Sequence, residues 1–166
     1  IVRAPGAVQF ERGRTKGSGI GLAYDKNQDV LTIADRVSVM MSSAAGAAPL
    51  QVDAGAAEFM RGARTIHFSR HVKAVRDSET VEADEGTAHL SEDEQRMERL
   101  ELRGNARLAP VHKQAGALQA LQGRDIDITY APDGQTIERA HINGDAAIEL
   151  AGTSPAGGRR ITATSI

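Results

Sequence analysis

Apolar and polar residues alternate along four segments of the chain that align with one another without gaps. In each segment the first, third, seventh and ninth residues are apolar, and nearly all the even positions are polar. A period of two residues predicts a β-strand with one buried face. The four segments, which recur every 34 to 40 residues, are Leu31–Val39, Ile66–Ala74, Leu100–Leu108 and Ala140–Ile148.

The middle of each segment departs from this alternation. The fifth residue should also face inward, yet it is Asp35, Arg70, Gly104 or Gly144, and a polar residue follows it every time. A buried position that accepts glycine or a charge predicts a β-bulge or a bend. We therefore expect each strand to turn there and to continue with the same face inward.

These strands belong to a larger repeating unit. A second run of strand-forming or small residues precedes each one, a short polar turn separates the two, and longer loops rich in Gly, Pro and Ser separate successive pairs. Such a unit buries its apolar face only by stacking on its neighbours, so we expect one domain over residues 1–166. The units begin near 19, 52, 81 and 121, their turns lie at 25–29, 61–64, 91–95 and 132–135, and residues 161–166 resemble the start of a fifth.

The third turn carries a competing pattern. Ser91 and Glu94 have capping-box spacing, and strong helix formers follow them. A short helix in this hairpin is therefore an alternative. The repeat favours a strand after the turn, because Leu100 and Leu102 are needed as strand residues.

Composition and charge restrict the classes of function. The chain has 20 Lys and Arg against 22 Asp and Glu, and this near balance argues against a nucleic-acid partner. Five Phe and Tyr and no Trp provide little stacking surface for sugars or bases. No segment reaches the roughly 18–20 apolar residues of a membrane-spanning helix. With no cysteine, no signal peptide and no initiator Met, we expect a piece of a longer chain without thiol chemistry.

Candidate chemical sites are sparse. Gly17–Gly21 lacks the spacing and the Lys-Ser/Thr pair of a phosphate loop, which favours a strand whose glycines permit close backbone approach. His67 and His71 share a face of a regular strand but diverge if Arg70 marks a bend, so surface histidines are favoured over a metal site. No nucleophile-elbow pattern is visible. An interpretation as a β-helix enzyme acting on polysaccharide would need a cluster of carboxylates or of basic residues on one face at one rung, and the sequence shows none. We expect no catalytic site, no cofactor and no metal.

The repeat resembles the OstA-like superfamily of lipopolysaccharide export (Lpt) proteins, which includes LptA, LptC and the N-terminal domain of LptD. The resemblance rests on the Ala-x-aromatic strand end, here Ala23–Asp25, and on the Leu-x-Leu-x-Gly-Asn strand, here Leu100–Ala106. It extends from about Gly17 to Ile166. Two copies depart from the pattern, because Asp35-Arg36 and Arg70-His71 replace Gly-Asn.

The resemblance implies an all-β fold, a V-shaped, repeat-built β-jellyroll of two facing antiparallel sheets. It also implies a periplasmic transport or bridge protein that is not an enzyme, possessing an apolar groove for the acyl chains of lipopolysaccharide. A segment outside this chain would tether it to the inner membrane. The groove lining expected on this basis is Leu31, Ile33, Val37, Val39, Ile66, Phe68, Val72, Leu100, Leu102, Leu108, Ile142 and Ile148.

The implied partners are other Lpt-type jellyroll domains, further copies of this chain among them, joined by pairing of edge strands. Residues Ala7–Phe10 and Ile161–Ile166 are the expected edges, since neither run contains Pro or Lys. A second interpretation remains open, in which the repeats form a structural β-solenoid of a surface or adhesive protein. It would have a closed, dry core and no lipid ligand.

Overall fold

The computed structural model contains eleven strands and, among the residues that it describes, no helix. It describes residues 1–42, 48–77, 79–110, 118–134, 136–152 and 158–166, with every side chain in these ranges except that of Arg12. The strands are β1 (Val2–Arg12), β2 (Thr15–Asp25), β3 (Val30–Met41), β4 (Leu50–Ala54), β5 (Ala56–Met60), β6 (Thr65–Arg76), β7 (Glu79–Leu90), β8 (Met97–Pro110), β9 (Leu118–Tyr130), β10 (Ile137–Leu150) and β11 (Arg159–Ser165).

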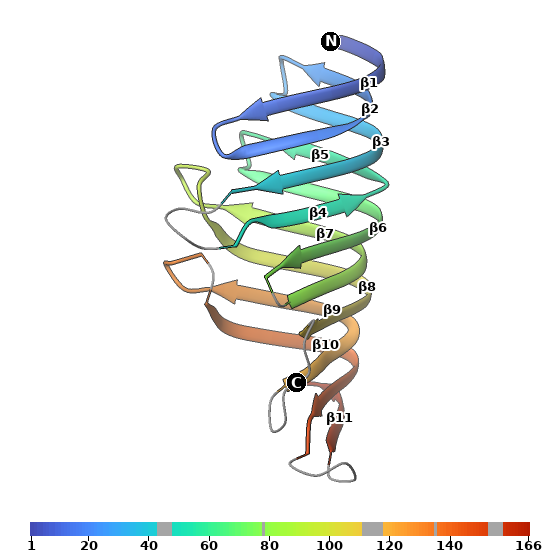
Figure 1. Cartoon of the computed structure of the whole chain (residues 1–166), viewed down its shortest axis with the longest axis vertical. Helices are drawn as coiled ribbons and strands as arrows, with labels where there is room; N and C mark the ends of the chain where they lie inside the picture. The colour runs from blue at the N-terminus through green and yellow to red at the C-terminus, as the bar shows by residue number, and fades with distance from the viewer. Residues whose placement is uncertain (43–47, 78, 111–117, 135, 153–157) are drawn as a thin grey trace.

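The strands form one antiparallel sheet in which, except at β4 and β5, each strand pairs with its neighbours in the sequence. β4 and β5 together take the place of one strand between β3 and β6, so the edges of the sheet are β1 and β11. Figure 1 shows the strands following one another along the long axis of the molecule. The predicted all-β class is confirmed, but a single continuous sheet replaces the two separate sheets that we expected.

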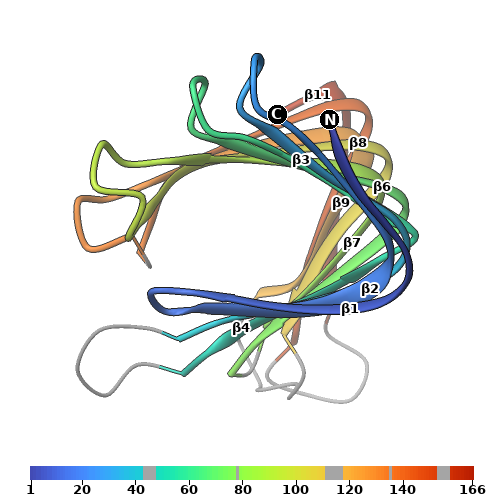
Figure 2. The ribbon, with the colours of Figure 1, turned by 90° about the horizontal axis from the view of Figure 1, so that it is seen from above.

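The sheet is folded along a crease that crosses its long strands, and Figure 2 shows the bend from above. At the crease Arg36, Arg70, Asn105 and Asp145 have left-handed backbone conformations. The pairing register shifts at the same places, where one strand has one residue more than its neighbour. These are β-bulges, which bend a strand and increase its twist. The bend predicted at the middle of each repeated segment is therefore confirmed.

The crease divides the sheet into two halves that face each other (Figure 2). We call the half that carries the four polar turns, at 26–29, 61–64, 91–96 and 131–134, the hairpin half. The opposite half, which ends in the β1–β2 turn, is the loop half. The apolar core lies between the two halves, and its fully buried members include Ile33, Leu102, Ile126 and Ile142.

Strands that have a bulge at the crease differ from strands without one in which positions they bury. On β8, Leu102, Ala106 and Leu108 are buried, so the alternation continues through the bulge as predicted. On β7 the buried positions are odd-numbered up to Ala83 and even-numbered from Gly86 onward. A bulge adds a residue on one strand only, and the unbulged neighbour must therefore change parity to keep its apolar side chains inside.

Arg70 links three strands at the crease. Its Nη2 donates hydrogen bonds to the carbonyl oxygens of Ala34 on β3 and Gly55 between β4 and β5, the latter at 2.5 Å. The amide of Gly55 donates to the Arg70 carbonyl at 3.0 Å. A side chain at position 55 would lie 2.5 Å from Arg70 Cβ, so only glycine permits this approach. Arg70, which stands where two other copies of the repeat have glycine, thus adds side-chain hydrogen bonds that a glycine could not make.

The segment that resembled a helix start is a tight turn. Glu94 donates its amide hydrogen to the Ser91 carbonyl at 2.8 Å, and the Arg96 amide donates to Ser91 Oγ at 3.1 Å. Glu94 has a φ of 56°, which lies outside the helical region. The helical alternative is wrong, and the strand register after the turn is confirmed because β8 begins at Met97.

Candidate functional site: a groove between the two halves

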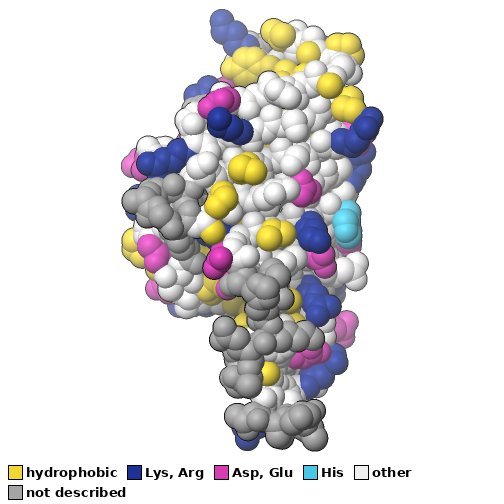
Figure 3. Space-filling model, in the orientation of Figure 1, with side chains coloured by type: hydrophobic (Ala, Val, Ile, Leu, Met, Phe, Trp, Pro, Cys, Tyr) yellow, Lys and Arg dark blue, Asp and Glu magenta, His cyan; other side chains and the backbone are white. Residues whose placement is uncertain are grey.

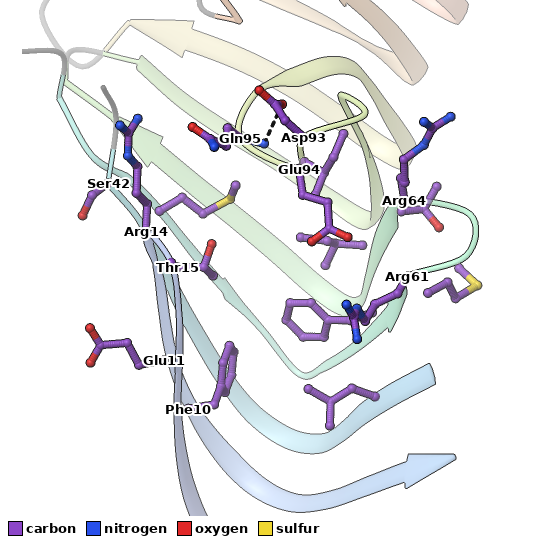
Figure 4. A pocket seen from close by; sticks show the side chains of 18 residues that line it. Phe10, Glu11, Arg14, Thr15, Ser42, Arg61, Arg64, Asp93, Glu94 and Gln95 are labelled. Atoms are coloured by element: carbon purple, nitrogen blue, oxygen red, sulfur yellow. Dashed lines mark hydrogen bonds between the residues drawn. The ribbon is translucent and has the colours of Figure 1, made fainter. Parts of the chain in front are cut away.

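A cavity of about 600 Å³ lies between the two halves near the β1 end of the molecule. Residues 10, 11, 13–15, 41 and 42 of the loop half line one side, and residues 31, 59–61, 64–66, 90 and 93–95 of the hairpin half line the other. Figure 4 shows this arrangement, with Phe10 and Thr15 across the cavity from Arg61 and Arg64. Its volume falls in the range of small-molecule sites. The apolar lining consists of Phe10, Leu31, Met41, Phe59, Met60, Ile66 and Leu90.

A second, narrower cavity of about 60 Å³ lies farther from β1. Met41, Ile66 and Leu90 line both cavities, so the two lie next to each other along the inside of the sheet, and we call the pair the groove. Apart from Arg76, Glu79 and Tyr130, the narrow cavity is lined by apolar side chains and Gly86.

Two contacts cross the groove from one half to the other. The rings of Phe10 on β1 and Phe59 on β5 meet edge to face, with centroids 5.5 Å apart and an angle of 81° between the planes. Farther along, Arg76 Nη1 at the end of β6 donates to the carbonyl oxygen of Gly134, in the β9–β10 turn, at 3.3 Å. These contacts hold the halves together at either end of the groove.

The polar residues at the mouth carry both signs of charge. Arg61 approaches Asp29 at 3.4 Å, and Arg64 lies 4.0 Å from the well-exposed carboxylate of Glu92. A hydrogen bond from the Ser91 hydroxyl lowers the pKa of Asp93. Because positive and negative groups are interspersed, the mouth forms a polar border between water and the apolar interior. It does not create an electrostatic field of a single sign.

Tyr130 lies at the hairpin-half end of the narrow cavity. Burial raises the pKa of Tyr130 to about 12, because the charged phenolate is poorly solvated there. The positive charge of Arg76 acts in the opposite direction, and the carboxylate of Glu79 adds to the rise. The hydroxyl therefore remains a hydrogen-bond donor at neutral pH.

All twelve residues expected to line the groove face the interior of the sheet, but only half of them border these cavities. Nine are buried, whereas Leu31, Leu100 and Ile148 are partly buried. Those that line one or both cavities are Leu31, Ile66, Phe68, Val72, Leu100 and Leu102. The six that line neither and sit among packed side chains are Ile33, Val37, Val39, Leu108, Ile142 and Ile148.

Sequence reasoning missed Phe59, Arg76 and Tyr130 as groove residues. A pattern was available for two of them, because Phe59 and Tyr130 are aromatic residues at the end of a strand and just before a polar turn. Tyr24 has the same position on β2, where its hydroxyl donates to Asp29 at 2.9 Å. Arg76 has no such pattern, since its contact partner is 58 residues away in the sequence.

The glycine run and the two spaced histidines occupy ordinary strand positions. Gly17 and Gly19 lie on β2, where an added Cβ would meet the side chains of Phe10 and Ile33, so these glycines make room chiefly for neighbouring side chains rather than for another backbone. His67 is partly buried and lies 3.0 Å from the Thr87 hydroxyl, whereas His71 is exposed within the bulge. Within the ranges that the structure describes, no three His, Asp or Glu side chains gather as metal ligands.

The outer surface of the hairpin half carries a charged network that we did not expect. Arg103 donates to Glu101 at 2.9 Å and to Asp127 at 2.8 Å, and Arg99 and His89 each lie 3.0 Å from Glu101. Although partial burial disfavours its charge, these carboxylates raise the pKa of Arg103. Cross-strand pairing brought these residues together, and each carboxylate already has an arginine partner.

Both expected edge strands lie at the edges of the sheet. β1 pairs only with β2, and β11 pairs only with β10. The first edge is longer than expected and contains Pro5, at a register shift between Ala4 and Ala7. Proline blunts this part of the edge, which leaves residues 7–12 as its regular portion. Figure 3 shows apolar side chains gathered at the β1 end, where Val2 is 66% exposed.

Comparison with known proteins adds no identification. No protein-family model matches the chain, and no curated protein does so. The described part of the chain also contains no helix of the length and apolarity needed to cross a membrane.

Proposed function

We propose that this protein shelters the acyl chains of lipopolysaccharide in the groove between its two halves. It acts as a periplasmic transport or bridge protein of the OstA-like type, without a catalytic site of its own. In this proposal the bent sheet takes the role of the β-jellyroll of that superfamily, with its two halves in place of the two facing sheets.

The observation that carries this proposal is the wide cavity with its apolar lining and charged mouth. An acyl chain that lies against Phe10, Leu31 and Ile66 leaves water, while the sugar part of the lipid stays at the mouth beside the charged turns. Each buried methylene contributes about 0.8 kcal/mol, so ten contribute about 8 kcal/mol before the cost of ordering the lipid. That gain is sufficient for reversible binding.

The two open edges support the bridging role. β11 and residues 7–12 of β1 present backbone groups that no other strand in the described ranges pairs with. An exposed antiparallel edge adds a strand from a partner, which extends the sheet and aligns the grooves of successive domains. The partners that we propose are other Lpt-type domains or further copies of this chain.

A second candidate is a structural β-solenoid repeat of a surface or adhesive protein, with no lipid ligand. The packing around β9 and β10 favours it, because Ile126, Ile128 and Ile142 are at most 1% exposed there. This part of the interior is closed, as a dry core requires.

Photo-crosslinking to lipopolysaccharide separates the two candidates. A photoreactive residue is placed at Leu31 in the wide cavity, at Phe68 in the narrow one, and at exposed Arg99 and Thr129 on the outer face as controls. Adducts at Leu31 or Phe68, with none at the controls, support the acyl-chain groove. A folded protein that gives no adduct at the interior positions favours the structural repeat.

A further inference from the structure

The narrow cavity has the form of an apolar end to the groove. Its volume of about 60 Å³ is a tenth of that of the wide cavity, so it holds only a few groups of the size of a methylene or a water molecule. A cavity with an apolar lining excludes water and takes up apolar groups. Six of its lining residues, from β4, β6, β7 and β8, are at most 7% exposed: Val52, Phe68, Val72, Ala88, Met97 and Leu102.

The interior of the sheet is packed beyond this cavity. Ile126 on β9, which lies opposite Leu102 on β8, is fully buried, and Ile142 on β10 is 1% exposed. Neither isoleucine lines either cavity. The two halves are also joined at the narrow cavity, where Arg76 Nη1 donates to the Gly134 carbonyl at 3.3 Å. An apolar chain that extends from the wide cavity therefore meets packed side chains at the end of the narrow one.

Gly86 forms part of the wall of the narrow cavity. It is buried on β7 and has no positive φ. An alanine Cβ at this position would lie 3.6 Å from Leu102 Cδ2 and 3.6 Å from Val72 Cγ1, which is ordinary van der Waals contact. The fold therefore accepts alanine here, and the added methyl group occupies space beside the cavity. Glycine at position 86 thus contributes to the depth of the cavity.

We propose that the narrow cavity receives the methyl end of an acyl chain and so limits the length of chain that the protein accepts. This inference rests on the proposed function, because it places an acyl chain in the wide cavity and its polar end at the mouth. Met41, Ile66 and Leu90 line both cavities, and the chain passes between them. The unbranched, flexible side chain of Met41 adapts to that passage.

The test measures affinity against chain length. Saturated fatty acids from octanoate to stearate, each below its micelle-forming concentration, compete with a fluorescent fatty acid for the 166-residue chain. The affinity of the wild type should rise about fourfold with each methylene, and it should stop rising once the chain end reaches the wall. Gly86→Ala should move this limit to a chain about one carbon shorter and leave the binding of shorter chains unchanged. Gly62→Ala is the matched control, because no heavy atom lies within 4 Å of its added Cβ, and it should follow the wild type at every length.

A second measurement reports which end of the chain lies in the narrow cavity. A fatty acid with a diazirine at its methyl end should label Phe68 or Met97, which line the narrow cavity. The same fatty acid with the diazirine beside its carboxyl group should label Thr15 or Leu31, which line the wide cavity. Mass spectrometry of the labelled protein identifies the residues. The reverse pattern would overturn the proposed orientation.

The outcomes separate this inference from the proposed function. If no fatty acid binds to the folded protein, the acyl-chain groove itself is refuted. If fatty acids bind and Gly86→Ala has the same length limit as the wild type, the groove stands and the narrow cavity does not limit the chain. An equal loss of affinity at every length in Gly86→Ala would also refute the inference, because the substitution would then act on the groove as a whole.

Discussion

Replacement of Gly104 by alanine tests whether left-handed bulges create the crease. Gly104 has a φ of 74°, and an alanine Cβ there would lie 2.3 Å from Oδ2 and 3.0 Å from Cβ of Asp84. The left-handed conformation costs a non-glycine residue about 1–2 kcal/mol. Displacement of Asp84 also breaks its hydrogen bond from Asn105 Nδ2, 2.8 Å long, worth about 0.5–1 kcal/mol. Alanine also lowers the conformational entropy of the unfolded chain, which offsets about 0.4–1 kcal/mol of this loss of stability.

The net expectation is that Gly104→Ala lowers the free energy of unfolding by about 1–2 kcal/mol. Urea unfolding followed by circular dichroism measures this change, and the slope against urea should match the wild type. Gly62→Ala is the matched control, because Gly62 has no heavy atom within 4 Å of the added Cβ and no positive φ. If Gly104→Ala is as stable as Gly62→Ala, left-handed geometry does not constrain the crease and the reasoning fails.

Three further predictions concern the contacts within and outside the groove. Phe59→Ala removes the ring contact with Phe10 and should cost about 2–3 kcal/mol in thermal unfolding, whereas a cost near zero would show that the contact does not hold the halves together. Since the pKa of Tyr130 rises from 10.0 to about 12 on folding, its contribution is complete below pH 10 and disappears as the pH rises to about 12. The free energy of unfolding of Tyr130→Phe should therefore fall less steeply than that of the wild type over that pH range. An unchanged pH profile would contradict the raised pKa of Tyr130. Arg103→Ala should lose about 1 kcal/mol in urea, a loss that shrinks in high salt because the ion pairs are partly exposed, and a salt-independent loss would point to packing instead.

The sequence predicted the strands and their bends because both depend on local chemistry. Alternation of apolar residues along Leu100–Leu108 is sufficient to predict a strand with one buried face, and a glycine at an inward position predicts a bulge. The same rule failed to describe β7, whose buried positions change parity between Gly86 and Ala83. That change is imposed by the bulges on the neighbouring strands, which no window within β7 reveals.

The groove was only partly predictable for a similar reason. Whether an inward-facing residue lines a cavity or packs in a solid core depends on how far apart the two halves of the sheet are at the position of that residue. Leu31 borders the wide cavity, whereas Ile33, two residues later on the same face, is fully buried. Period-two alternation assigns both residues to the interior and does not distinguish them.

Sequence alone therefore determined the all-β class, the repeating unit, the positions of the turns and the location of the crease. These follow from residue preferences over a few consecutive positions. Only the tertiary structure decided that a single sheet folds on itself, that Arg76 reaches Gly134 across the groove, and that Arg103 joins Glu101 and Asp127. Such contacts depend on pairing register and on the closure of the bend, which bring together residues far apart in the chain.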